Sequence, residues 1–255
     1  MVFSLRDSIR TEQPASVDSP PDTGQAKSLP RVPADRMSVA ARVIPFAAYI
    51  AVLALTPVLL GPADRLGIPA IWLHPLNGIV AGLLLVYFWR YYDELREKLS
   101  PSGASVSFAV GVVIFWLWIT LDAPWMVWGA SPQFDPTYGD GSVADRVSTG
   151  FRLLSLIAVV PLMEELFWRS FLMRWIADHD FLHVDPRRVT WFAFTATAVL
   201  FAIEHHLWLA GLVAGIAFNL LYMWTRNIWA PIIAHVAANA FLGVYIIAYR
   251  RWDLW

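Results

Sequence analysis

The sequence predicts an all-α, polytopic integral membrane protein: a helical bundle with about seven to eight transmembrane helices. Hydrophobic residues make up 58% of the 255 residues and charged residues only 15%, and the mean hydropathy is +0.52. Ordinary soluble domains carry about 25% charged residues, so this chain is too apolar to be surrounded by water. Its apolar residues also gather in separate runs, most of which approach the roughly 20 residues that a helix needs to cross a bilayer.

Each apolar run is interpreted as one transmembrane helix. The runs cover residues 43–60, 71–89, 104–121, 151–176, 189–203, 207–224 and 228–248. Residues 1–37 precede them, are polar and proline-rich, and are expected to form a disordered tail. Because the tail lacks the apolar core of a secretory signal peptide, the first helix is expected to be an uncleaved anchor. Residues 38–255 then form the helical domain.

A polar segment, residues 122–150, separates the third run from the fourth and contains several prolines and glycines. A loop of this length in a membrane protein is either a lid over a binding site or a solvated connector. The sequence leaves both interpretations open.

The composition excludes several classes of protein. A formal charge of −1 argues against a nucleic-acid partner. With no cysteine, the chain has no disulfide framework, thiolate nucleophile or cysteine-based metal site. Tryptophan is abundant, at 14 residues, and Trp116, Trp118, Trp125 and Trp128 are predicted to lie in interfacial belts. Lys and Arg fall mostly on the side of the N-terminal tail, which predicts a cytoplasmic N-terminus.

Two adjacent glutamates interrupt the fourth apolar run. Glu164 and Glu165 are followed by Arg169 within the same run. A charged side chain near the membrane centre costs roughly 2.5–3.5 kcal/mol on insertion scales, so three of them within six residues need a functional or structural reason. Glu165 and Arg169 are four residues apart and can pair on one helix face. Glu164 points about 100° away from Glu165 and is free to face another helix.

Three further polar residues lie in later apolar runs. His205 follows Glu204 and precedes His206, while His235 and Asn239 lie one helical turn apart. At about 1.5 Å per residue, Glu164 lies roughly 20 Å, His205 roughly 24 Å and Asn239 roughly 17 Å from the inner end of its run. We therefore expect three helices to bring their polar groups to a similar depth. Which of His205 and His206 faces the site is open.

These residue types suit water activation with oxyanion stabilisation. A carboxylate beside an imidazole can take a proton from water, and a second imidazole with an amide N–H can stabilise a tetrahedral intermediate. Neither Gly-x-Ser-x-Gly nor His-Glu-x-x-His occurs in the chain. Structural interpretations remain open: the Glu165–Arg169 pair can serve packing, and a lone buried His235 is often only hydrogen-bonded. A proton-coupled transporter is a weaker alternative, because no inverted repeat is visible.

At these residues the chain resembles the CAAX prenyl protease type II family, also called the CPBP or Abi family. The family pattern is Glu-Glu-x-x-x-Arg, then Phe-x-x-x-His, then His-x-x-x-Asn. The matching positions are Glu164-Glu165…Arg169, Phe201…His205 and His235…Asn239, and the motif core covers residues 151–241. The N-terminal runs are similar to the bacterial, exosortase-associated branch of the family, which places the chain in the inner (cell) membrane.

The resemblance implies an intramembrane endopeptidase that hydrolyses a peptide bond in a membrane-anchored, in some cases prenylated, substrate. The implied catalytic residues are Glu164, Glu165, Arg169, His205, His235 and Asn239: Glu164 and His205 activate water, His235 and Asn239 bind the oxyanion, and the Glu165–Arg169 pair orients the centre. No cofactor is firmly implied, although two Glu and two His could hold zinc; both a glutamate-type and a metal-dependent mechanism are open. The alternative is a non-catalytic immunity or scaffold protein of the same family.

Overall fold

The computed structural model describes residues 36–67, 72–73, 75–129 and 143–254. Every regular element within these ranges is helical and none is a strand, which confirms the all-α prediction. The described residues all belong to one packed unit. The predicted disordered tail falls almost entirely outside the described residues. Its last two positions are helical, because α1 begins at Arg36.

Four helices are long and apolar enough to cross a membrane: α1 (Arg36–Arg65), α3 (Pro101–Thr120), α8 (Trp208–Thr225) and α9 (Trp229–Tyr249). Two shorter apolar helices, α2 (Leu76–Tyr87) and α7 (Trp191–Glu204), lie beside them. Only 6% of the most apolar window of α1 is buried, against 44% for α8 and α9. The first helix therefore lies at the periphery, and the two C-terminal helices form the interior of the bundle.

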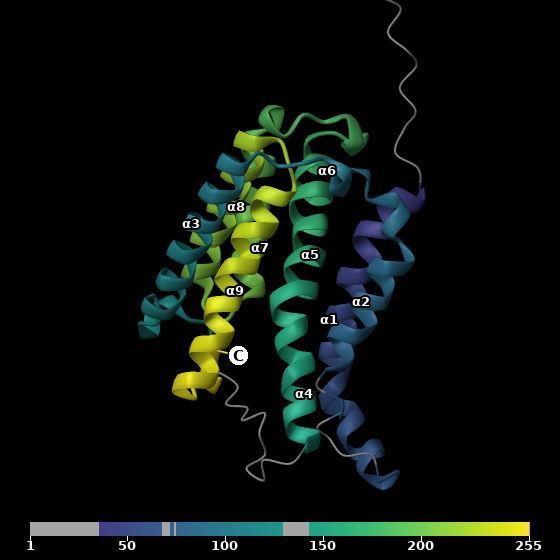
Figure 1. Ribbon diagram of the computed structural model, residues 1–255. Coiled ribbons are helices and arrows are strands. Elements are labelled where there is room, and N and C mark those ends of the chain that lie inside the picture. The colour runs from purple at the N-terminus through teal and green to yellow at the C-terminus, as the bar shows by residue number, and fades with distance from the viewer. Residues whose placement is uncertain (1–35, 68–71, 74, 130–142, 255) are drawn as a thin grey trace, which may run out of the picture. The chain divides into compact units, whose positions relative to one another are not determined.

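The fourth apolar run forms one long helical rod with two wider segments (Figure 1). It consists of α4 (Val143–Leu154), a π-helical segment (Ser155–Val159), α5 (Val160–Glu165), a second π-helical segment (Leu166–Leu172) and α6 (Met173–Ala177). The predicted start at residue 151 was wrong. The last part of the predicted loop 122–150 is helical, and residues 130–142 lie outside the described residues.

Short 3₁₀ helices connect the longer elements. They are Trp89–Tyr91, Asp93–Arg96, Pro124–Met126, Phe181–His183, Pro186–Arg188 and Trp252–Leu254. α2 is shorter than the predicted run 71–89, because it begins at Leu76 and ends at Tyr87, and Trp89 already starts the first 3₁₀ helix. Two C-terminal helix ends, after α8 and α9, turn on residues with φ of 55°, Arg226 and Arg250.

Small residues set how closely the helices pack. A Cβ atom added at Gly111 in α3 would overlap the carbonyl oxygen of Ala234 in α9, and one added at Gly78 in α2 would overlap the side chain of Ser155. A Cβ at Gly215 in α8 would lie 3.2 Å from Ala198 in α7. Such contacts are typical of membrane helices, where close backbone approach replaces hydrophobic burial as the source of packing energy.

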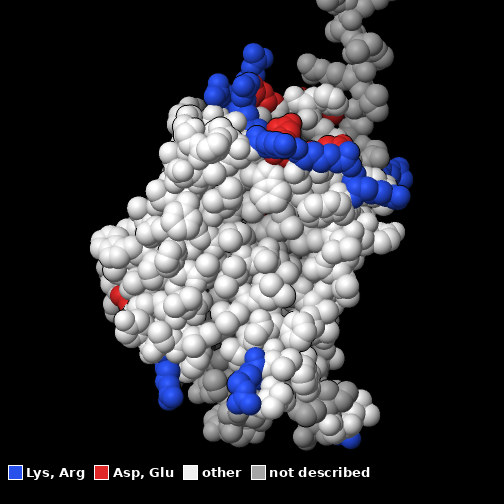
Figure 2. All heavy atoms as spheres, viewed as in Figure 1, with Lys and Arg blue, Asp and Glu red and all other residues white. Residues whose placement is uncertain are grey.

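The surface has the charge distribution of a membrane-spanning protein. Figure 2 shows a middle band almost free of charged side chains, with charged side chains at both ends and more of them at the end where α6 lies. Large apolar side chains are widely exposed, including Phe192 at 73%, Val58 at 68% and Leu83 at 66%. Exposure on this scale would be costly in water and is favourable against lipid. The chain is an integral membrane protein, while the cytoplasmic N-terminus stays a prediction.

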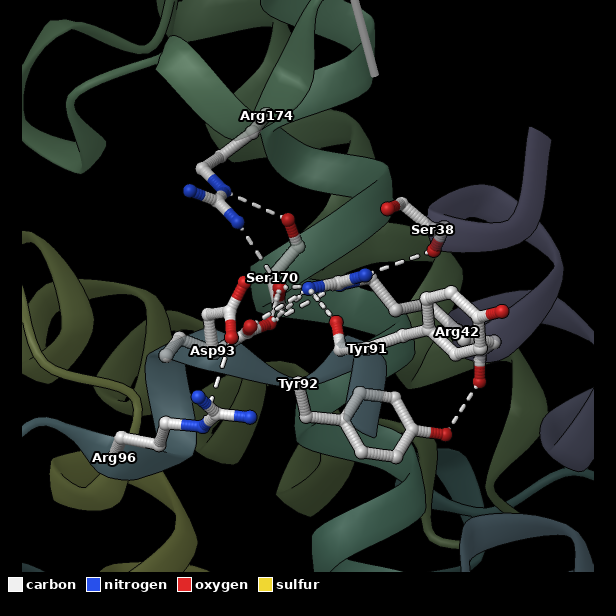
Figure 3. Close-up of polar contacts among 10 residues, drawn as sticks. Ser38, Arg42, Tyr91, Tyr92, Asp93, Arg96, Ser170 and Arg174 are labelled. Atoms are coloured by element: carbon white, nitrogen blue, oxygen red, sulfur yellow. Dashed lines mark hydrogen bonds and ion pairs between the residues drawn. The ribbon is translucent and has the colours of Figure 1, made fainter. Parts of the chain in front are cut away.

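A buried ion-pair cluster holds the N-terminal helix against the long rod (Figure 3). The Arg42 guanidinium is 1% exposed and donates to both carboxylate oxygens of Glu94 at 2.7 Å and to the Ser170 hydroxyl at 3.0 Å. Ser170 also donates to Glu94 and accepts from Arg174. Burial raises the pKa of Glu94, but Arg42 and these hydrogen bonds outweigh burial and leave the pKa below its usual value. The cluster joins α1, the connector after α2, and the residue next to Arg169.

The lowered pKa of Glu94 predicts acid sensitivity. A carboxylate whose folded pKa is depressed stabilises the protein above its unfolded pKa, and this contribution is lost as the pH falls through the folded pKa. We expect Glu94→Gln to melt at a lower temperature than the wild type at pH 7, and the difference to shrink below pH 4.5, the ordinary pKa of the group. Thermal unfolding in a neutral detergent checks this, with the exposed Glu97→Gln as control. A temperature difference that does not vary with pH would contradict it.

Candidate active site

The helix that carries the two glutamates is distorted by a proline. At the first π-helical segment, the backbone N–H of Val160 donates to the carbonyl of Ser155, five residues back. In this register the carbonyl of Leu156 would accept from residue 161, which is a proline and has no N–H. The side chain of Asn239 takes that place, with Nδ2 donating to the Leu156 oxygen at 2.8 Å. The sequence break at Pro161 therefore fixes where Asn239 lies.

The two glutamates have different surroundings. Glu165 is fully buried, and its Oε1 accepts from Arg169 and contacts Nδ1 of His235, each at 2.9 Å. The predicted Glu165–Arg169 pair is therefore confirmed. Glu164 is 5% exposed and faces a cavity, and its Oε2 has no hydrogen-bond partner among the described residues. One carboxylate is thus paired with Arg169 inside the bundle, while its neighbour faces the cavity.

Arg169 is held from several sides. Its Nε donates to Oδ1 of Asn219 at 3.1 Å, and its guanidinium lies 4.5 Å from the ring centre of Phe201 and 5.2 Å from that of Phe218. Asn219 in turn donates to the carbonyl of Phe194 and to Thr197. Asn219 was not among the predicted site residues. Its signal in the sequence was an amide inside an apolar run, and its part in the site follows only from its contact with Arg169.

A cavity of about 310 Å³ brings the other predicted residues together. Its lining includes Glu164, His205, His235 and Asn239. Its walls are apolar side chains contributed largely by α1, α3 and α9, among them Ile50, Leu53, Ile114, Phe115 and Leu242. The predicted convergence of three helices is therefore present in the structure. Glu165 and Arg169 lie behind the cavity and reach it through His235.

His205 and the adjacent His206 both line the cavity, and they are held differently. The His205 ring places Nδ1 at 2.7 Å from the carbonyl of Phe201. A carbonyl only accepts, so Nδ1 carries the hydrogen and the neutral ring has a lone pair on Nε2. Trp118 packs edge-on against this ring, with centroids 5.2 Å apart. The backbone carbonyl of His206 accepts from the N–H of Trp128. These contacts favour His205 as the oriented ring.

Three of the predicted interfacial tryptophans make specific contacts within the protein. Trp118 lines the cavity and packs against the His205 ring, a contact that the belt assignment did not anticipate. Trp125 accepts through its carbonyl a hydrogen bond from Nε1 of Trp208, and Trp128 packs against Trp208 with ring centroids 5.7 Å apart. Part of the predicted loop is thus fastened to the start of α8. An apolar run shows that a tryptophan lies near the membrane but not which helix it faces.

Residues 146–241 match the protein-family model described as type II CAAX prenyl endopeptidase Rce1-like. The predicted family resemblance is confirmed. All of the predicted site residues lie inside the matched segment, which begins near the start of α4 and ends in α9. Searches of curated proteins and of solved structures found no match. The match supports a function of the general type found in CAAX-type intramembrane proteases.

Two cavity residues were given no role from the sequence. Glu204, inside the Rce1-like region, ends α7 directly before His205, and Tyr49 of α1, outside that region, also lines the cavity. Among the described residues, no group of three or more His, Asp or Glu side chains is arranged to hold a metal ion. The zinc alternative therefore stays a prediction from residue types alone. The glutamate-type mechanism also draws on the position of Glu164 and His205 in the same cavity.

Proposed function

We propose that the protein is an intramembrane endopeptidase that hydrolyses a peptide bond of a membrane-anchored substrate, using water activated by Glu164 and His205. One observation carries this proposal. A buried carboxylate without a hydrogen-bond partner on Oε2 and an imidazole with a free Nε2 line the same cavity. Two such acceptors can hold a water molecule between them, and a carboxylate beside an imidazole can take a proton from that water.

In the proposed reaction, Glu164 takes one proton from the water while Nε2 of His205 accepts a hydrogen bond from the other. The oxygen attacks the carbonyl carbon of the scissile bond, so a carbon–oxygen bond forms and the carbonyl oxygen becomes negative. Glu164 then gives its proton to the leaving nitrogen as the carbon–nitrogen bond breaks. A single carboxylate thus acts first as the base and then as the acid, and Glu164 ends the reaction in the protonation state in which it began.

His235 and Asn239 are the proposed oxyanion donors. Nδ2 of Asn239 uses one hydrogen on the Leu156 carbonyl, which leaves the second N–H of the amide for a substrate oxygen. The contact between Nδ1 of His235 and Glu165 fixes the orientation of the ring, whose Nε2 can donate to the developing oxyanion when it carries a hydrogen. Donors fixed in this way need no rearrangement during the reaction.

The surroundings of the cavity support a membrane-anchored substrate. A peptide bond must reach a cavity that is walled by apolar side chains and flanked by membrane-spanning helices, so a substrate already held in the bilayer arrives at the right depth. A prenylated tail is the substrate type suggested by the family match. The excess of Lys and Arg on the side of the N-terminal tail supports a cytoplasmic N-terminus in a bacterial inner membrane.

Comparison of membrane proteins cut in cells tests the proposal without a known substrate. Cells producing the wild type and cells producing His205→Ala at equal levels are compared by mass spectrometry of protein termini in the membrane fraction. We expect termini that occur only with the wild type, and reconstitution of their parent proteins with purified protein should reproduce the cuts, with and without a prenyl group. Identical sets of termini would contradict hydrolysis and favour a non-catalytic scaffold or immunity role.

A further inference from the structure

The cavity has an unbalanced charge. Its lining contains three acidic residues, Glu164, Glu204 and Asp253, and no Lys or Arg. Asp253 is neutralised locally, because Arg251 contacts its carboxylate at 2.8 Å. Glu164 and Glu204 are therefore the acidic groups of the cavity without a neighbouring Lys or Arg, and both line a space with largely apolar walls.

Neither of these carboxylates has a cationic partner in the described part of the chain. No ion pair within 4.0 Å involves Glu164 or Glu204, and Oε2 of the nine-tenths-buried Glu164 accepts no hydrogen bond there. Arg169 follows the glutamate pair closely but is engaged by Glu165 and Asn219. The Glu164 carboxylate is removed from water without a partner, which is costly, whereas the Glu204 side chain is exposed. A positive group entering the cavity can therefore reach Glu204 and at the same time compensate for the buried Glu164.

Glu204 lies where an acidic side chain is unfavourable. It is the last residue of α7, where the helix end carries partial negative charge and an acidic side chain is disfavoured. An acid at this place lowers stability unless something compensates for it. Glu204 also directly precedes His205, so a cation bound to Glu204 would lie close to the ring proposed to orient the reacting water.

We propose that Glu204 is a specificity-determining residue that binds a cationic group of the substrate, such as a lysine or arginine side chain near the scissile bond. The inference rests on the proposed function for the identity of the substrate, and on the cavity alone for the charge of the group. A substrate with an acidic residue at the same place would meet two carboxylates and be rejected. The geometry requires no further cofactor or reactant.

Binding of small amphiphiles tests the inference without any hydrolysis. The probes are n-octylguanidinium, n-octylurea of the same shape without charge, and n-octyl phosphate, each titrated into the purified full chain in a neutral detergent by calorimetry. We expect octylguanidinium to bind at least tenfold more tightly than octylurea, and Glu204→Gln to lose about tenfold in affinity for the guanidinium alone. Octyl phosphate should bind more weakly than octylurea.

Three variants give the test its controls. Glu97→Gln removes an exposed charge outside the cavity and should leave all affinities unchanged, while Glu204→Lys should reverse the order of the guanidinium and phosphate probes. Equal binding of the charged and uncharged probes, or loss of guanidinium binding in Glu164→Gln but not in Glu204→Gln, would overturn the assignment. If the guanidinium binds as expected and no peptide is cut, the proposed hydrolysis fails by itself and the cation site stands.

Discussion

Glu164→Gln is expected to lower the cleavage rate by a factor of about 10² to 10⁴, the usual contribution of a positioned general base, while the protein remains folded. The amide of glutamine has nearly the shape of the carboxylate and cannot take a proton from water. Because Oε2 of Glu164 has no partner among the described residues, the substitution removes a buried charge without breaking an ion pair. The melting temperature should therefore stay equal or rise.

The measurement needs both rate and stability from the same preparation. The substrate is a membrane protein whose new terminus appears only in cells producing the wild type, and its cleavage is followed after reconstitution. Unfolding is followed by intrinsic fluorescence in the same lipid or detergent. Glu97→Gln, which removes an exposed glutamate, is the matched control and should change neither quantity. A Glu164→Gln variant with undiminished turnover would end the proposal that this carboxylate activates water, whatever the substrate.

Much of the fold follows from hydropathy because the physical demand is simple. A segment surrounded by lipid must satisfy its backbone hydrogen bonds internally and present apolar side chains, and α3, α8 and α9 begin and end within three residues of the predicted runs. The same signal does not report helices that extend beyond the apolar part. α4 begins at Val143 because its polar residues are compatible with a helix, although hydropathy alone assigns them to a loop.

The sequence predicted which residues gather at the candidate site and at what depth, but not the contacts between them. The spacing of Glu165 and Arg169 was enough to pair them, since one helical turn fixes their separation. The partners of Arg169 on α8 and the orientation of Asn239 depend on which helices are neighbours, and local sequence does not encode that choice. Glu204 shows the same limit: an acid at the end of an apolar run can face water, headgroups or a cavity, and only packing decides between them.

Removing the neighbouring carboxylate is expected to have the opposite effect on stability. Glu165→Leu leaves the Arg169 guanidinium, 1% exposed, without the carboxylate that it contacts at 2.9 Å, and His235 loses its Nδ1 partner. Breaking a buried ion pair from one side costs about 3–5 kcal/mol, because an uncompensated charge remains inside. We expect a loss of this size in the free energy of unfolding, measured by denaturant titration in detergent micelles.

The double variant separates the charge from the packing. In Glu165→Leu combined with Arg169→Met, both charges of the pair are removed, so most of the lost stability should return, while His235 still lacks its partner and activity stays low. Glu165→Gln, which retains a hydrogen-bond acceptor, should lie between the wild type and Glu165→Leu. A double variant no more stable than Glu165→Leu would show that the pair acts through shape. If the stability does return, replacing the two adjacent glutamates has opposite effects: the Glu164 variant is stable and inactive, and the Glu165 variant is unstable because its arginine is buried without a partner.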